Sequence, residues 1–329
     1  QTGKHRQMTG GTSRDGGPVF SPDGSTIAFT STRAQKPQIF LLPVDGGEAR
    51  QLTYMKQGAS GPKWSPDGGK IAFTSGPDYG DDEPPDLSKD VYRVTRNVNR
   101  FDAMGYLDQA VSDIYVIEAD AKKGDDPTRL TDDDTLNMIA EWTPDGSAIL
   151  FSAMMRPDTF ALFYPSVHTV DLEGNITDIT GDENRAVQGA RLTPDGKKLV
   201  YMGQIPGSDI GTKSDLWVLD LKTQELTNRT ENLAFGVGGY VGGDMPTGML
   251  RAPGLKLPNN DVCYTTVQSG GNVHIYKVAL HGDEHWEPVV TGERSLYPQD
   301  IVKDTLLFAS MDINQTPNLY IKSLDGDSS

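Results

Sequence analysis

The chain has 329 residues, a formal net charge of −16, 36% hydrophobic residues and 23% charged residues. This acidity excludes general affinity for nucleic acid or an anionic membrane surface, because binding to phosphate groups needs clustered Lys and Arg. No apolar run approaches the roughly 20 residues of a membrane helix, and the single cysteine, Cys263, excludes a disulfide framework. We therefore expect a globular protein without nucleic-acid or membrane partners; the oligomeric state is left open.

Residues 1–9, QTGKHRQMT, begin without Met and lack the apolar core of a signal peptide. Either a leader has been removed or the chain is a piece of a longer protein. A cytoplasmic location is favoured, with the periplasm as the alternative. The pattern of these residues is that of the last strand of the repeats described next, so residues 1–9 are predicted to form a closing strand.

A short turn motif recurs along the chain. FSPDG at Phe20–Gly24 returns as WSPDG at 64–68, WTPDG at 142–146 and LTPDG at 192–196. Pro presets φ for the second position of a turn, Asp accepts hydrogen bonds from local backbone amides, and Gly tolerates unusual φ values. Runs typical of strands, such as TIAFTS and KIAFTS, follow the turns, so each motif predicts a hairpin.

Each hairpin belongs to a longer unit with a third strand and a short fourth strand. The fourth strand ends in Thr in the first four units, and two later units keep the strands but have lost the turn motif. A period of about 40–50 residues with four strands per unit is typical of a β-propeller. The predicted units are residues 10–53, 54–131, 132–180, 181–230, 231–291 and 292–329.

The predicted fold class is therefore all-β, a single propeller domain of four-stranded blades over residues 1–329. Six blades are countable, and the sixth lacks its fourth strand. Residues 1–9 would supply that strand and close the ring. The competing interpretation is a seven-bladed propeller whose first blade is truncated.

The segment from Val91 to Thr131 carries a family resemblance. It contains Arg93, Arg96 and Arg100, a D-x-x-G-Y stretch at 102–106, and the ending Arg129–Thr131. This order resembles the propeller of acylaminoacyl-peptidase-type enzymes in the prolyl oligopeptidase family, and the repeated turn is common in bacterial TolB-like propellers. The resemblance implies a bacterial serine peptidase in which the propeller admits short peptides to a C-terminal α/β-hydrolase domain with a Ser-Asp-His triad.

No catalytic residue is predicted in this chain. A nucleophile elbow needs G-x-S-x-G on a strand-to-helix turn, and the sequence contains no such pentapeptide. Substrate binding is predicted for Arg93, Arg96 and Arg100, of which a subset would face the peptide chamber and bind a carboxylate. The alternative is an edge strand whose arginines pair with the preceding acidic loop, GPDYGDDEPPDLSKD.

Metal and cofactor binding are not predicted. His281 and His285 in HGDEHW lie four residues apart, but that spacing aligns ligands only on a helix and the stretch has the pattern of a loop. A propeller-fold lyase with a metal centre is kept as a third interpretation.

Two functions thus compete at the sequence level. The first is a non-catalytic propeller domain that gates short peptides into a hydrolase domain absent from this chain. The second is a stand-alone, TolB-like propeller whose loops bind partner proteins.

Overall fold

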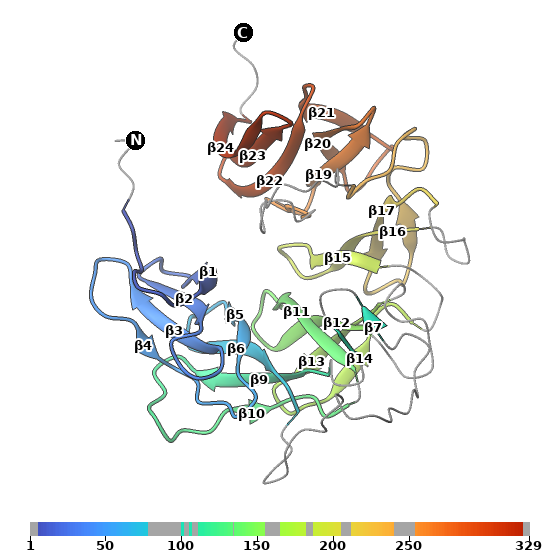
Figure 1. The fold of residues 1–329 in the computed structure, drawn as a ribbon. Coiled ribbons are helices and arrows are strands. Elements are labelled where there is room, and N and C mark those ends of the chain that lie inside the picture. The colour runs from blue at the N-terminus through green and yellow to red at the C-terminus, as the bar shows by residue number, and fades with distance from the viewer. Residues whose placement is uncertain are drawn as a thin grey trace. The chain divides into compact units, whose positions relative to one another are not determined.

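The computed structural model describes most of the chain and contains strands and turns but no helix among those residues (Figure 1). The described residues are 6–77, 100–101, 105–106, 111–133, 135–154, 165–181, 187–204, 212–239 and 254–324. They form two compact units, Gln1–Gly181 and Asp182–Ser329, each of which is described by itself.

The first unit contains three four-stranded antiparallel sheets, here called blades 1 to 3. Blade 1 consists of β1 (Asp15–Phe20), β2 (Thr26–Ser31), β3 (Gln38–Pro43) and β4 (Arg50–Gln51). Blade 2 consists of β5 (Ser60–Trp64), β6 (Lys70–Ser75), β9 (Asp113–Glu118) and β10 (Thr128–Arg129). Blade 3 consists of β11 (Leu136–Trp142), β12 (Ala148–Met154), β13 (Ser166–Asp171) and β14 (Ile176–Asp178). A separate two-stranded ladder joins β7 (Arg100–Phe101) to β8 (Gly105–Tyr106).

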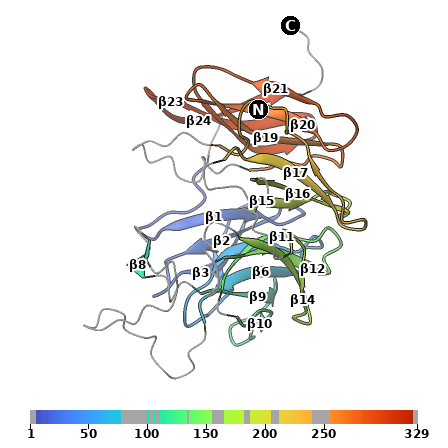
Figure 2. The ribbon, with the colours of Figure 1, turned by 90° about the vertical axis from the view of Figure 1, so that its right-hand side faces the viewer.

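The second unit contains blades 4 and 5. Blade 4 repeats the four-stranded pattern with β15 (Val187–Leu192), β16 (Lys198–Gly203), β17 (Asp215–Asp220) and β18 (Leu226–Asn228). Blade 5 is a six-stranded sheet, coloured orange to red in Figure 2. Its strands are β19 (Val262–Ser269), β20 (Asn272–Ala279), β21 (Trp286–Val290), β22 (Ser295–Val302), β23 (Thr305–Asp312) and β24 (Gln315–Ser323).

The all-β propeller class is confirmed, but the prediction of six or seven blades is wrong: the described residues form five. The last two predicted repeats form one sheet, because β20 and β22 pair in parallel through Val273 and Ser295. In the described residues before β19, two isolated bridges join this sheet, from Val237 to Val267 and from Lys256 to Tyr264. Of the predicted closing strand, residues 1–5 lie outside the described part and residues 6–9 form no strand.

The repeated sequence I-A-F explains how the first blades pack. Successive side chains of a strand point to opposite faces. In β2, Ala28 faces blade 2 while Ile27 and Phe29 belong to a separate cluster on the other face. In β6, Ile71 and Phe73 fill the space beside Ala28. A small residue on one blade thus meets two large ones on the next, which gives the close packing of a protein core.

In blades 1 to 4, a Thr two residues after the end of the fourth strand forms a hydrogen bond to the third strand. Thr53 Oγ1 accepts a bond from the Ile39 backbone N–H at 2.9 Å and donates one to Gln38 Oε1 at 2.8 Å. Both Thr53 and Gln38 are buried. The same acceptor role is repeated by Thr131, Thr180 and Thr230 towards the N–H groups of Ile114, Val167 and Leu216.

Candidate functional site: a cleft between blades 1 and 2

The four S/T-P-D-G turns of this chain share a shape that comes from hydrogen bonds to the aspartate of each turn. Asp23 Oδ1 accepts a bond from Ser21 Oγ at 2.6 Å and from the Ser25 N–H at 3.0 Å. These bonds, above all the one from Ser21, lower the pKa of Asp23 to about 2. Gly24 adopts φ 73°, a region that favours glycine. The same kind of hydrogen bonding lowers the pKa of Asp67, Asp145 and Asp195.

The turns of neighbouring blades in the first unit are in contact. Trp64 Nε1 donates to the Val19 carbonyl at 3.2 Å, and Trp142 Nε1 donates to the Lys63 carbonyl at 3.0 Å. In both cases the acceptor directly precedes the aromatic residue of the previous turn. A Cβ at Gly68 would lie 3.5 Å from Pro22 Cδ, in ordinary van der Waals contact. The motif therefore builds the junction between blades as well as the hairpin.

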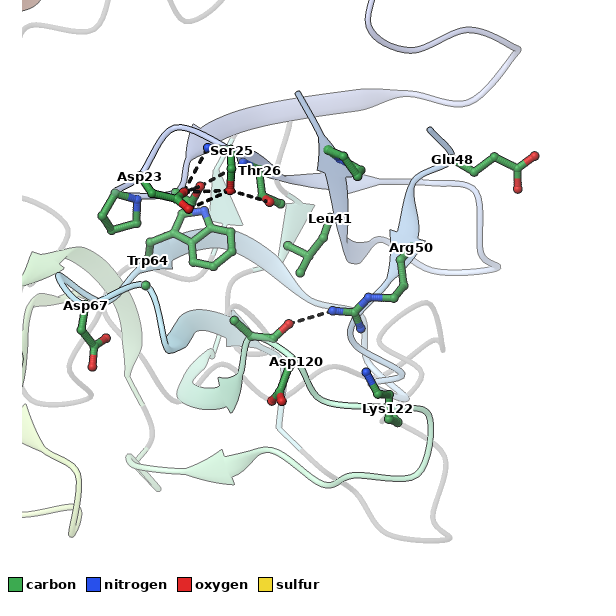
Figure 3. A pocket seen from close by; sticks show the side chains of 15 residues that line it. Asp23, Ser25, Thr26, Leu41, Glu48, Arg50, Trp64, Asp67, Asp120 and Lys122 are labelled. Carbon is green, nitrogen blue, oxygen red and sulfur yellow. Dashed lines mark hydrogen bonds between the residues drawn. The ribbon is translucent and has the colours of Figure 1, made fainter. Parts of the chain in front are cut away.

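A cleft of about 590 Å³ lies at the junction of blades 1 and 2 (Figure 3). Its apolar wall includes Trp64 and Leu41, and the two turns flank it on one side. The lining residues are Ser21, Pro22, Asp23, Ser25, Thr26, Leu41, Pro43, Glu48, Arg50, Trp64, Asp67, Gly68, Ala119, Asp120 and Lys122. All of them come from two adjacent blades of the same compact unit.

Arg50 forms the floor of this cleft and joins the two blades. Its Nη1 donates to the Ala121 carbonyl and its Nη2 to the Ala119 carbonyl, each at 2.7 Å. The second of these bonds is drawn in Figure 3. The Arg50 guanidinium has no carboxylate partner among the described residues. Because two of its five N–H donors bond to carbonyls of blade 2, Arg50 has a structural role at the junction, and it keeps its positive charge in the cleft.

The remaining charged side chains of the cleft are available to a ligand. Glu48, Asp120 and Lys122 make no side-chain hydrogen bond or ion pair within the part of the chain that the structure describes. Asp67 uses only Oδ1 in its turn, accepting from Ser65 Oγ at 2.6 Å and from the Gly69 N–H at 2.9 Å. The lining thus contains four carboxylates, of Asp23, Glu48, Asp67 and Asp120, and two cations, Arg50 and Lys122, which leaves an excess of negative charge.

Of the three arginines predicted from the sequence to bind substrate, the structure describes Arg100 alone. Arg93 and Arg96 fall outside the described residues. Arg100 is in β7, where it pairs with Tyr106 of β8. Their assignment to substrate binding stays a prediction. Within the same segment, Arg129 pairs with the fully buried carboxylate of Asp113 at 2.6 Å.

Reasoning from the sequence missed the cleft because its residues come from distant segments. Arg50 lies in the short fourth strand of the first repeat and Asp120 lies after the long insertion of the second, so no motif connects them. The only sequence signal was the change from Phe20 to Trp64 at the residue that precedes the turn. Trp adds an N–H donor at that position, and this donor is the one that bonds to Val19.

A second cluster places a serine beside a histidine in blade 3. Ser166 Oγ lies 2.7 Å from His168 Nε2, and His168 Nδ1 lies 3.8 Å from Asp178 Oδ1. The order of groups is that of a catalytic triad. However, Ser166 is only 7% exposed and begins a strand whose next N–H is already used by Thr180. A buried hydroxyl of this kind cannot be reached by a peptide bond, so we interpret the cluster as structural.

The described residues contain no helix that is long and apolar enough to cross a membrane. Within the described ranges, no three His, Cys, Asp or Glu side chains are placed to share a metal ion.

Comparison with known proteins identifies the fold. The family model of the TolB beta propeller domain, PD40, matches residues 1–81. No curated protein matches the chain. An acylaminoacyl peptidase from Pyrococcus horikoshii superposes with a TM-score of 0.68 at 16% identity, over 95% of this chain and 44% of that one.

Two further structures superpose on the chain with lower TM-scores. A prolyl endopeptidase superposes with a TM-score of 0.62 at 12% identity, covering 95% of this chain and 41% of that one. A TolB protein from Agrobacterium tumefaciens superposes with a TM-score of 0.51 at 16% identity, covering 84% of this chain and 80% of that one. The chain resembles the propeller domains of acylaminoacyl peptidase and prolyl endopeptidase, and it spans less than half the length of those peptidases.

Proposed function

We propose that the chain is the non-catalytic propeller domain of a serine peptidase of the acylaminoacyl-peptidase type. The observation that carries this proposal is the superposition of 95% of the chain on under half of such a peptidase. The hydrolase domain would belong to the same parent polypeptide. Short peptides would be its substrates, and Arg93, Arg96 and Arg100 would remain the candidates for contact with their carboxylates.

The physical role of such a domain is exclusion. The blades of a propeller surround a central channel, and a folded domain of 100 residues has a radius of gyration of about 13 Å. A short extended peptide is much narrower. Strands whose backbone groups are paired along their length resist local opening. A nucleophile behind such a domain would be protected from folded proteins and accessible to short chains.

The test has two parts. The coding sequence that continues from this chain should encode G-x-S-x-G followed by Asp and His, and the complete product should hydrolyse N-acetylated peptides with sensitivity to a serine-directed inhibitor. The present chain alone should hydrolyse none of these substrates. A stop codon directly after the chain, together with an inactive product, would overturn the proposal.

A second function, that of a TolB-like module that binds a partner protein, is favoured by a different observation. The TolB family model covers residues 1–81, which include all of blade 1 and the first two strands of blade 2 with their turn. The cleft with its unpaired carboxylates lies largely in this region. Affinity purification of the complete protein would separate the two functions, because only the second requires a stable stoichiometric partner for its role.

A further inference from the structure

The last two strands of blade 5 repeat the second and third strands of blade 1. The sequences TIAFTS of β2 and QIFLLP of β3 correspond to TLLFAS in β23 and NLYIKS in β24. The register agrees, because Phe29 stands opposite Phe40 in blade 1 and Phe308 stands opposite Tyr320 in blade 5. The ring centroids of these two pairs are 6.0 Å and 5.7 Å apart. β24 therefore corresponds to β3, the third strand of a four-stranded blade.

The outer edge of β24 carries no fourth strand among the described residues. β3 pairs with β4 on this edge, whereas β24 is the last strand of its sheet and pairs with β23 (Figure 1). Ile39 and Leu41 of β3 are 0% and 6% exposed. The corresponding residues of β24, Leu319 and Ile321, are 57% and 55% exposed. An unpaired strand edge of this kind is a template for the addition of another strand.

The fourth strands of the other blades show what a third strand of this chain accepts. In blade 1, the Leu52 N–H donates to the Ile39 carbonyl at 2.8 Å, and Thr53 Oγ1 accepts from the Ile39 N–H at 2.9 Å. The Leu52 side chain lies in the same apolar cluster as Ile39 and Leu41. The same pair of backbone contacts and the same order, an aliphatic residue followed by Thr, recur in blades 2 and 3 at Leu130–Thr131 and Ile179–Thr180.

β24 retains the groups that receive such a strand. Asn318 stands opposite Ser310, as Gln38 stands opposite Ser31 in blade 1. At this position Gln38 accepts a hydrogen bond from the Thr53 hydroxyl at 2.8 Å. Asn318 donates through Nδ2 to the Thr316 carbonyl, and its Oδ1 accepts no hydrogen bond within the described part of the chain. An acceptor for a threonine hydroxyl is thus present on β24.

We propose that β24 binds, as an added antiparallel strand, a segment of a partner polypeptide in which an aliphatic residue is followed by threonine. The threonine hydroxyl would accept from the Leu319 N–H and donate to Asn318 Oδ1. The aliphatic side chain would cover Leu319 and Ile321. The occupant is chosen because fourth strands of this chain use the same chemistry on their own third strands. In strand addition, backbone hydrogen bonds give affinity and side chains give specificity. This inference is independent of the proposed peptidase function.

The amino-terminal segment of this chain has a similar pattern. Residues 5–9 read HRQMT, which is close to ARQLT at 49–53. The described contacts of this segment lie in the first unit, where Arg6 donates to the Val44 carbonyl and Met8 packs against an apolar cluster of blade 1. A separate polypeptide is therefore the occupant assigned to β24, and a variant at Thr9 tests that assignment.

The test is an NMR titration of the full chain that follows the backbone amides of Leu319 and Ile321. The probe is the acetylated and amidated peptide ARQLT. One matched control has Val in place of Thr, and the other is N-methylated at its Leu, so that they lack the hydroxyl and the backbone N–H respectively. ARQLT should shift both amides in a saturable manner and slow the hydrogen exchange of Leu319. Each control should bind about two- to tenfold more weakly.

Variants of the chain separate strand addition from general apolar contact. Leu319→Pro removes the outward N–H, and the fold should persist, since proline is tolerated on an edge strand where its nitrogen faces solvent. Circular dichroism checks the fold, and binding, followed at Ile321, should be lost. Leu319→Ala keeps the N–H and should still bind the peptide saturably.

Thr9→Val removes the hydroxyl from the amino-terminal segment and should leave the affinity for the peptide unchanged. A higher affinity in Thr9→Val would assign the edge to the chain's own segment and overturn the proposal. The proposal would also be overturned by the absence of a saturable shift in the unmodified chain, by equal binding of ARQLT and its two controls, or by undiminished binding to a folded Leu319→Pro.

Discussion

Arg229 Nε donates to the Ala279 carbonyl at 2.9 Å, and this bond joins blade 4 to blade 5 within the second unit. The same guanidinium also donates to the carbonyls of His281, Gly282 and Asp283 at 2.9–3.1 Å. The side chain of Arg229 is only 5% exposed. A buried cation that is satisfied by four backbone carbonyls fixes a turn without any carboxylate partner.

We therefore expect Arg229→Met to destabilise the second unit by roughly 2–4 kcal/mol, because buried carbonyls lose charged donors. Arg50→Met is the matched comparison, since Arg50 is exposed and bonds to only two carbonyls. Its cost should be smaller, about 1 kcal/mol. Urea unfolding followed by circular dichroism measures both. Equal midpoints for the two variants would contradict the clamp assigned to Arg229.

Replacing the threonine that follows the fourth strand should cost more stability in blade 4 than in blade 3. Thr230 is fully buried, accepts from the Leu216 N–H at 2.9 Å and donates to Asp215 Oδ1 at 3.0 Å. Thr230→Val keeps the shape but leaves both groups without this partner, at a cost of roughly 2–3 kcal/mol. Thr180→Val removes the bond from the Val167 N–H and has no carboxylate to leave unpaired. Thermal denaturation should therefore show a larger loss for Thr230→Val.

Low pH should destabilise the folded chain, because it protonates the aspartates of the repeated turns. An unfolded aspartate has a pKa of about 3.9, whereas hydrogen bonding lowers that of Asp23 to about 2. The folded state thus binds fewer protons, and the stability contributed by Asp23 is complete above pH ~4 and is lost as the pH falls towards 2. Asp67, Asp145 and Asp195 shift in the same direction.

Protonation of Asp113 has the opposite effect on the stability of the folded state. Burial raises its pKa despite the Arg129 ion pair, so its protonation in acid favours the folded state. Unfolding midpoints measured from pH 5 to pH 2 should still fall, since four turn aspartates oppose one buried aspartate. Asp23→Asn should flatten this dependence. A pH-independent midpoint would show that the turn hydrogen bonds do not favour the ionised carboxylate.

Cys263 is predicted to be inert in the folded chain. It is fully buried in β19, and desolvation raises the pKa of its thiol to about 12. Because the thiolate is the reactive form, Ellman's reagent should modify Cys263 only when the second unit opens. The rate of labelling then reports that opening and should rise in Arg229→Met. Rapid labelling of the native chain would place Cys263 at an accessible site.

Ser166 is expected to be unreactive as a nucleophile, although His168 lies 2.7 Å from its hydroxyl. A fluorophosphonate probe should leave the chain unlabelled, because Ser166 is buried at the start of β13. Ser166→Ala serves as the control for labelling at any other position. If the probe labels the chain and Ser166→Ala abolishes that labelling, Ser166, His168 and Asp178 form a catalytic triad.

The repeated turns were predictable from sequence because their chemistry is local. The bonds of Asp23 to Ser21 and Ser25 are contained within one motif, and the same holds for the carboxylate of Asp195. The sheet that unites the last two repeats was not predictable, because it depends on the parallel pairing of Val273 with Ser295. The alternation of apolar and polar residues along either strand does not indicate that pairing.

The cleft was beyond sequence reasoning for a similar reason. Trp64 marks the junction of two blades, but the partner positions Arg50 and Asp120 are set by tertiary packing. Likewise, only the strand register shows that Thr26 of blade 1 stands at the position of Lys70 in blade 2.

The most direct test of the proposed function is the rate at which the complete protein hydrolyses N-acetylated peptides of increasing length, followed by a folded protein with the same acetylated N-terminus. Exclusion by the propeller predicts that kcat/KM falls steeply beyond short peptides and that the folded protein is not cleaved. Cleavage of the folded protein at the rate of the short peptides would contradict a gating role.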